Sequence, residues 1–147
     1  MELAGKRILV IGGAGLIGSH TVDALLQEPV AEVRIFDNFS RGRVENLASA
    51  LQDNRVHVFP HGGDILHRDL LDEAMRGIDG VFHFAALWLL HCHEYARSAF
   101  EVNVGGTFNV LEACVKRGVQ RLVYSSSASV YGDAVGGIAK VGGEQNP

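Results

Sequence analysis

The sequence predicts an α/β protein in which helices cover both faces of one parallel sheet. Short runs of β-branched residues alternate with longer helical patterns along most of the 147 residues, and a glycine cluster directly follows the first run. Hydrophobic residues make up 47% of the chain and charged residues 20%, an ordinary globular balance. We therefore expect one domain at residues 1–135 and a short tail at residues 136–147.

Five runs rich in β-branched residues are typical of buried strands. They are residues 7–11, 32–37, 56–59, 79–84 and 121–125. Helical patterns lie between them at residues 16–26, 44–51, 66–75 and 95–116. Right-handed crossovers then favour the strand order 3-2-1-4-5, a doubly wound Rossmann fold. In such a sheet the ligand crevice lies at the carboxyl ends of the first and fourth strands.

Two of the predicted helices have recognisable ends. Asp64 lies just before the third helix, where a carboxylate can cap free backbone amides. Gly118 follows the longest helix and is typical of a helix C-terminus. Apolar residues recur within that helix at steps of three and four, namely Phe100, Val104, Phe108, Leu111 and Val115.

Composition and charge exclude several classes of protein. The net charge of -4 does not favour nucleic acid or an anionic membrane as a partner. Cys92 and Cys114 are too few for a disulfide framework, so we expect reduced thiols and a cytoplasmic protein. The longest apolar stretch, residues 81–90, is too short to span a bilayer. His91 and His93 do not share a helix face and have no further ligands in sequence, so no metal site is expected.

The glycine cluster predicts a dinucleotide-binding loop. Gly12, Gly15 and Gly18 follow a strand and open a helix. They permit a tight turn, close approach of a pyrophosphate, and packing of helix on strand. The pyrophosphate would rest on backbone amides at the helix start, which includes Leu16 and Ile17. The alternative, a flexible surface loop, fits poorly with an acidic residue about twenty positions later.

That acidic residue, Asp37, ends the second predicted strand. A carboxylate there accepts hydrogen bonds from the adenosine ribose hydroxyls and repels a 2′-phosphate, so NAD is favoured over NADP. Arg41 and Arg43 lie nearby in sequence and could soften this preference.

Six motifs occur together in a specific order. They are Gly12–Gly18, Asp37–Ser40, Gly63–Ile65, His83–Ala86, Asn103–Thr107 and Ser125–Gly132. As an ordered set they resemble the extended short-chain dehydrogenase/reductase superfamily, in particular its NAD-dependent nucleotide-sugar epimerase/dehydratase branch. The resemblance covers residues 6–132, which is most of the chain.

This resemblance implies roles for individual residues. Asp64 and Ile65 correspond to the pair that holds the adenine, and Asn103 to an asparagine that lines the cofactor pocket. The other cofactor-binding positions that it implies are Asn38, Ser40, Arg41, Gly42, Phe84, Ala85, Ala86 and Ser125. Ser127 matches the catalytic serine, and Ser129 a position near the sugar. The alternative for this last segment is a plain serine-rich loop.

The resemblance also implies chemistry that this sequence does not complete. Relatives use a tyrosine of a Tyr-x-x-x-Lys motif as general base while hydride passes to NAD. Lys140 matches the lysine, but Gly136 stands at the tyrosine position. None of the three tyrosines of the chain has a lysine four residues later. The alternative for residues 137–145 is an unrelated glycine-rich tail. We therefore expect a chain that binds NAD and is weak or inactive as an enzyme, or else a non-catalytic NAD-binding or dimerisation module.

Partners follow from the same resemblance. Relatives bind a UDP- or GDP-linked sugar with a C-terminal substrate domain, and these 147 residues end before such a domain. The long helix that begins near Tyr95 often contributes to a homodimer in relatives, so we expect self-association. Trp88 is expected to pack beneath the crevice or in an interface.

Overall fold

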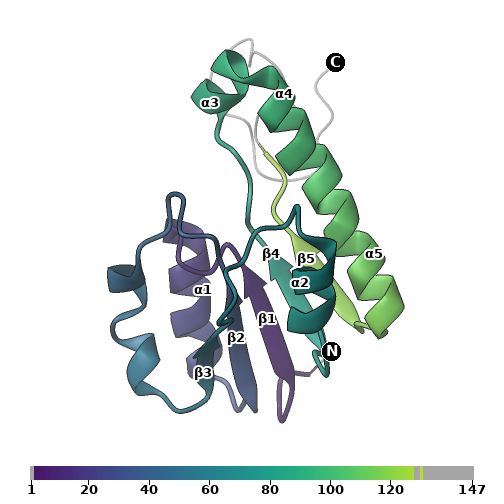
Figure 1. The fold of residues 1–147 in the computed structure, drawn as a ribbon. Coiled ribbons are helices and arrows are strands. Elements are labelled where there is room, and N and C mark those ends of the chain that lie inside the picture. Colours follow the sequence, from purple (N-terminus) through teal and green to yellow (C-terminus); the bar gives the residue numbers. More distant parts are fainter. Residues whose placement is uncertain (1, 128–129, 131–147) are drawn as a thin grey trace, which may run out of the picture.

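The computed structural model describes residues 2–127 and 130. Five parallel strands form one sheet in the order β3-β2-β1-β4-β5, which confirms the predicted topology. The strands are β1 (Arg7–Ile11), β2 (Glu32–Phe36), β3 (Val56–Val58), β4 (Gly80–His83) and β5 (Arg121–Tyr124). Ile8 on the central strand pairs with Val33 of β2 and with Gly80 of β4. Figure 1 shows this sheet, with the carboxyl ends of β1 and β4 toward the side on which α3 and α4 project.

The helices follow the predicted order with three differences. They are α1 (Leu16–Leu26), α2 (Arg68–Ala74), α3 (Leu89–Glu94), α4 (Ala96–Ala99) and α5 (Thr107–Arg117), together with the 3-10 turns η1 (Val44–Leu47) and η2 (Ala50–Gln52) and the π-helical segment η3 (Phe100–Gly106). The predicted helix at 44–51 is thus two short 3-10 turns, α3 was not predicted, and the long helix changes to π-helical geometry partway.

Asp64 does not cap α2 as predicted. His67 occupies the N-cap position and makes no side-chain capping bond. The Asp64 carboxylate instead accepts a hydrogen bond from the Leu66 amide at 2.9 Å, which closes a local turn before the helix begins. The prediction that Gly118 ends the long helix is confirmed, because Gly118 adopts a left-handed backbone with φ of 68°.

Alternate residues of each inner strand enter two separate cores. Leu9 and Ile11 of β1 pack with residues of α2 and α5 on one face of the sheet. Ile8 and Val10 pack on the opposite face with Val22 of α1 and its neighbours. Both faces are therefore buried, as the continuous apolar strands predict.

The long helix buries a different face from the one that its apolar periodicity suggests. Val110, Ala113 and Cys114 contact the core. The regular stripe of Phe100, Val104, Phe108, Leu111 and Val115 lies on the outside, where Val115 reaches 83% exposure. Gly106 permits the helix to approach the segment before α2, since a Cβ there would lie 2.5 Å from Cδ1 of Ile65. In the part of the chain that the structure describes, no helix is both long and apolar enough to cross a membrane.

His83 at the end of β4 is a buried imidazole with one hydrogen bond. Its side chain is 0% exposed, and its Nε2 lies 3.1 Å from Oγ1 of Thr107 at the start of α5. Nδ1 has no hydrogen-bond partner among the described residues. Burial lowers the pKa of His83 from 6.5 to about 4, so the ring is neutral at neutral pH.

This buried imidazole predicts an acid-sensitive fold. The unfolded chain binds a proton at His83 more readily than the folded chain does, so stability falls as pH drops from 6.5 toward about 4. The maximal slope from this group is about 1.4 kcal/mol per pH unit. We expect His83→Gln to reduce the pH dependence of the unfolding free energy in this window, measured by urea denaturation. The same substitution at His57, exposed on β3, is the control. If the unfolding free energy of His83→Gln changed with pH as steeply as that of the wild type, the prediction would be contradicted.

Candidate cofactor site

The candidate residues meet at the carboxyl edge of the sheet. Because β1 lies between β2 and β4, the loops that follow these three strands are neighbours in space. The glycine loop follows β1, Asp37 follows β2, and Phe84 follows β4. This is the edge at which open α/β sheets bind their ligands.

Glycine is required at two points of the loop because the backbone packs too closely for a side chain. Gly12 has φ of 78°, and a Cβ there would lie 2.8 Å from the Ala85 nitrogen. A Cβ at Gly18 would overlap the carbonyl oxygen of Gly12. Gly15 is less confined, since only the Gly12 oxygen lies near, at 3.3 Å. The loop thus places the start of α1 close to the carboxyl ends of β1 and β4.

The first turn of α1 has the properties of an anion site. Gly15 is its N-cap, no side chain makes a capping hydrogen bond, and the first turn contains no acidic residue. The leading amides of a helix have no intrahelical acceptors, and the helix dipole makes this end positive. The glycines of residues 12–18 therefore leave a hollow that a Cβ would narrow. The backbone amides of the same residues supply donors to it, and this combination fits a pyrophosphate.

The Asp37 carboxylate is held by backbone amides on either side. Oδ2 accepts a hydrogen bond from the Ala14 amide at 2.8 Å, and Oδ1 accepts one from the Phe39 amide at 2.8 Å. The residue is 8% exposed. Each oxygen retains acceptor capacity toward a ligand hydroxyl. Contact with the ribose stays a prediction, while the structure shows that Asp37 also joins β2 to the glycine loop.

The two loops that carry Asn38 and the predicted adenine pair, Asp64 and Ile65, contact each other. Asn38 accepts a hydrogen bond from the Ser40 amide at 3.0 Å, and its Nδ2 lies 3.5 Å from Oδ2 of Asp64. The Ile65 side chain is buried in the core, and its carbonyl accepts a hydrogen bond from Asn109 at 3.0 Å. The adenine contact predicted for Ile65 would therefore come from its backbone, whereas the Asp64 side chain is half-buried.

The segment after β4 is placed by the strand and by Asn103. Phe84 donates its amide to the Ile11 carbonyl at 2.8 Å, and Ala85 and Ala86 follow it along the edge. The Asn103 side chain accepts a hydrogen bond from the Leu87 amide at 2.7 Å and donates one to the Leu87 carbonyl at 3.0 Å. Its Nδ2 also lies 3.4 Å from Sγ of Cys92. The structure therefore gives Asn103 a positioning role, and direct contact with a cofactor stays a prediction.

The predicted catalytic segment begins at the end of β5. Ser125 donates its amide to the His83 carbonyl at 3.3 Å, which continues the sheet by one bond beyond Tyr124. Ser127 is exposed, and its carbonyl accepts a hydrogen bond from the Val130 amide at 3.2 Å. Ser129, Lys140 and the predicted tail at 136–147 lie outside the described residues.

Trp88 lies at this edge and is not packed beneath the crevice, because 46% of the residue is exposed. The other expectation for Trp88, an interface, stays a prediction. The Arg41 guanidinium carbon lies 4.8 Å from the Trp88 ring centroid, which is a cation–π contact. The pairing joins residues 47 positions apart in sequence (41 and 88), and no local pattern signals it.

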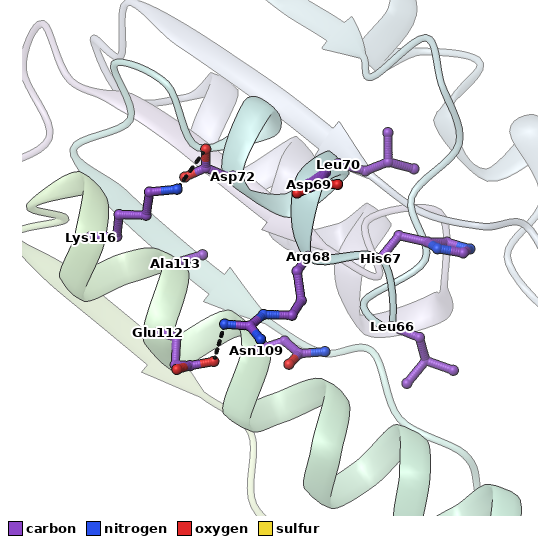
Figure 2. A pocket seen from close by; sticks show the side chains of 10 residues that line it. All are labelled: Leu66, His67, Arg68, Asp69, Leu70, Asp72, Asn109, Glu112, Ala113 and Lys116. Carbon is purple, nitrogen blue, oxygen red and sulfur yellow. Dashed lines mark ion pairs between the residues drawn. The ribbon is translucent and has the colours of Figure 1, made fainter.

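A separate groove lies between α2 and α5. Figure 2 shows its walls, and its volume is about 790 Å³. Arg68 pairs with Glu112 at 3.1 Å, and Lys116 with Asp72 at 3.1 Å. None of the predicted cofactor residues lines this groove. With its charges paired across the two helices, it is a helix–helix junction rather than the candidate site.

The described residues contain no group of three metal-ligating side chains that could hold an ion. The prediction of a metal-free site is therefore not contradicted within that part of the chain. His91 and His93 lie on the short helix α3, and the His91 ring packs against Tyr95 at a centroid distance of 5.0 Å.

Comparison with known proteins identifies the family. Residues 9–147 match the 3-beta hydroxysteroid dehydrogenase/isomerase family. UDP-glucose 4-epimerase 3 of Oryza sativa subsp. japonica is 38% identical over 88% of this chain and 36% of its own length. The 3 beta-hydroxysteroid dehydrogenase/Delta 5-->4-isomerase of Mycobacterium tuberculosis is 40% identical over 95% of this chain and 35% of its own length.

Solved structures agree with this assignment. The dTDP-glucose 4,6-dehydratase DesIV of Streptomyces venezuelae, determined with NAD bound, superposes with a TM-score of 0.83 at 38% identity, over 89% of this chain and 42% of its own. The chain thus spans about two fifths of the length of the relatives it matches. With its parallel five-stranded sheet and glycine loop, the chain belongs to the 3-beta hydroxysteroid dehydrogenase/isomerase family of extended short-chain dehydrogenases/reductases.

Proposed function

We propose that this chain binds NAD at the carboxyl edge of its sheet and forms the cofactor-binding part of a nucleotide-sugar epimerase or dehydratase. The observation that carries the proposal is the uncapped start of α1 beside the amide-held Asp37 carboxylate. Positive amides suit the two phosphates, and a carboxylate at the end of β2 suits ribose hydroxyls. Relatives solved with NAD bound support this choice of cofactor.

The chain's own residues would hold the cofactor and orient the substrate. Backbone amides of Leu16 and Ile17 bind the pyrophosphate, Asp37 accepts from the adenosine ribose, and Asp64 reads the adenine amino group. The segment 84–86 supports the nicotinamide ribose, and Ser127 donates a hydrogen bond to the reacting oxygen of the substrate. Bound NAD supplies a hydride acceptor for a carbon that bears a hydroxyl group.

Catalysis by these residues alone lacks a general base. Four residues after Tyr95, Tyr124 and Tyr131 stand Ala99, Ala128 and Val135, so no tyrosine has the lysine that lowers its pKa in relatives. We infer that the 147-residue chain binds NAD with weak or no turnover. Formation of NADH from NAD and UDP-glucose by this chain would contradict that inference.

A steroid alcohol is the second candidate substrate. The 40% identity to a 3 beta-hydroxysteroid dehydrogenase and the family match favour it. Both substrate classes present a secondary alcohol whose carbon gives up hydride, so the same cofactor edge serves either. We prefer the nucleotide sugar because UDP-glucose 4-epimerases and dTDP-glucose 4,6-dehydratase are similar to this chain in both sequence and structure.

We further propose that the chain is cytoplasmic and forms a homodimer through the exposed stripe on η3 and α5. Both cysteines are free, and burial raises the pKa of Cys114 to about 11, which keeps this thiol unreactive. The stripe repeats along one helix surface, so two copies related by a two-fold axis can bury it against itself.

Asp37 provides the direct test of cofactor binding. We expect Asp37→Ala to weaken NAD binding by about tenfold to a hundredfold, because a hydrogen bond to a charged group contributes about 1.5–3 kcal/mol. Isothermal titration calorimetry measures the change. Asp23→Ala, on an exposed position of α1, is the charge-matched control. Absence of NAD binding to the unaltered chain would disprove the proposal.

Substitutions in the glycine loop should affect NAD affinity and folding stability to different extents. Gly15→Ala meets only one backbone atom at 3.3 Å, so it should fold normally while weakening NAD binding through the methyl group in the hollow. Gly18→Ala meets backbone on several sides and should lower both Tm and affinity. Gly105→Ala, with nothing within 4 Å, is the control for both measurements. Equal NAD affinity in Gly15→Ala and Gly105→Ala would contradict the assigned phosphate position.

The dimer proposal predicts that a charge on the stripe separates the copies. Phe108→Glu places a carboxylate at an exposed apolar position of α5 and should shift the protein toward monomer in sedimentation velocity. Val44→Glu, exposed on η1 and remote from the stripe, should not. A monomeric unaltered chain at micromolar concentration would count against this part of the proposal.

A further inference from the structure

We propose that Arg41 is a ligand of the dinucleotide's pyrophosphate and that Trp88 holds its guanidinium in place over the glycine loop. This inference rests on the proposed NAD site. The carrying observation is the contact between the Arg41 guanidinium and the Trp88 ring at 4.8 Å.

The topology of the sheet places this contact over the predicted phosphate position. Arg41 belongs to the loop after β2, and Trp88 to the segment between β4 and α3. In the order β3-β2-β1-β4-β5, the strand between these two is β1. A side-chain contact between the two loops at the carboxyl edge therefore spans the end of β1, where the glycine loop opens α1.

The loop that bears Arg41 is fixed directly to the glycine loop. Arg43 donates its amide to the Ala14 carbonyl at 3.1 Å, and Asn46 donates its side-chain amide to the same oxygen at 2.8 Å. A Cβ at Gly42 would lie 2.8 Å from Cβ of Ala14 and 2.9 Å from Oδ1 of Asp37. Arg41 thus extends from a backbone that touches the predicted cofactor loop.

Trp88 stands on an equally fixed segment. Leu87, its neighbour, is clamped at both backbone groups by Asn103. The Trp88 carbonyl accepts a hydrogen bond from the Cys92 amide at 3.0 Å, at the first turn of α3. The half-exposed ring therefore provides a stable surface on which a planar guanidinium can stack.

The charge of Arg41 is available to an anion. Across residues 2–127 and 130, no carboxylate lies within ion-pair distance of Arg41, whereas Arg34, Arg55 and Arg117 are all paired. Among the described residues, no hydrogen bond uses the N–H groups of the Arg41 guanidinium, so its five donors are open to a ligand. A pyrophosphate on the leading amides of α1 would offer oxygens to those donors, and the pair of residues would cover it.

The inference predicts a loss of affinity that depends on the pyrophosphate. We expect Arg41→Ala to weaken binding of NAD and of ADP-ribose about tenfold or more, with adenosine changed by less than about twofold, because only adenosine lacks the phosphates. The affinity of Arg41→Lys for these ligands should lie between those of wild type and Arg41→Ala, since lysine keeps the charge but not the planar guanidinium.

Arg76→Ala removes an exposed positive charge after α2, away from the carboxyl edge, and is the charge control. Calorimetry at two salt concentrations should show a smaller salt dependence for Arg41→Ala.

The single tryptophan gives a second readout without enzymatic activity. Trp88 is the only tryptophan in the chain, so fluorescence excited at the red edge of indole absorption reports on the surroundings of this one ring. In the ligand-free protein, Arg41→Ala should make Trp88 more accessible to acrylamide quenching. ADP-ribose should protect Trp88 in the unaltered protein and protect it less in Arg41→Ala.

Three outcomes separate this inference from the proposed function. If the unaltered chain binds NAD and Arg41→Ala binds ADP-ribose equally well, the pyrophosphate role is wrong and the NAD site stands. If Arg41→Ala loses affinity only for NADP, Arg41 reads a 2′-phosphate and the inference is overturned. If the unaltered chain binds neither NAD nor ADP-ribose, both proposals fail together.

Discussion

The close contact between the glycine loop and the exit of β4 is the constraint on which the candidate site depends. Gly12 takes a left-handed backbone so that the chain can turn within van der Waals contact of Ala85. Gly18 then lets the first turn of α1 lie against the Gly12 carbonyl. A side chain at either position would move the helix start away from the sheet, and its free amides would no longer point into the edge between β1 and β4.

Side-chain to backbone hydrogen bonds stabilise the two sides of this edge. Asp37 connects β2 to the glycine loop through Ala14, and Asn103 connects the long helix to the segment after β4 through Leu87. Both residues are among those that the family resemblance assigns to the cofactor. Their contacts show that such residues also set the positions of the loops around a ligand, so their substitution acts on binding and on the shape of the site together.

The electrostatics of the edge vary along the path that we propose for the dinucleotide. The start of α1 and Arg41, which has no ion pair within residues 2–127 and 130, make its centre positive, while Asp37 and Asp64 make the side next to β2 negative. This distribution of charge suits phosphates at the centre and ribose hydroxyls beside β2. The groove between α2 and α5 has ion pairs that join its two helices and lacks this arrangement.

The amino-acid sequence alone predicted the glycine loop and the acidic end of β2, because these follow from local periodicity and from backbone geometry that only glycine tolerates. The preference for right-handed crossovers between the predicted strands also favoured the strand order that is observed. Periodicity also located the long helix, but it did not indicate the buried face: Phe100, Val104 and Phe108 lie outside, and smaller residues such as Ala113 contact the sheet. The buried face of this helix, the hydrogen bonds of Asn103 to Leu87 and the contact of Arg41 with Trp88 emerge only from the three-dimensional arrangement of the chain. Each of these contacts joins segments that come together only when the strands pair, and so no local pattern in the sequence encodes them.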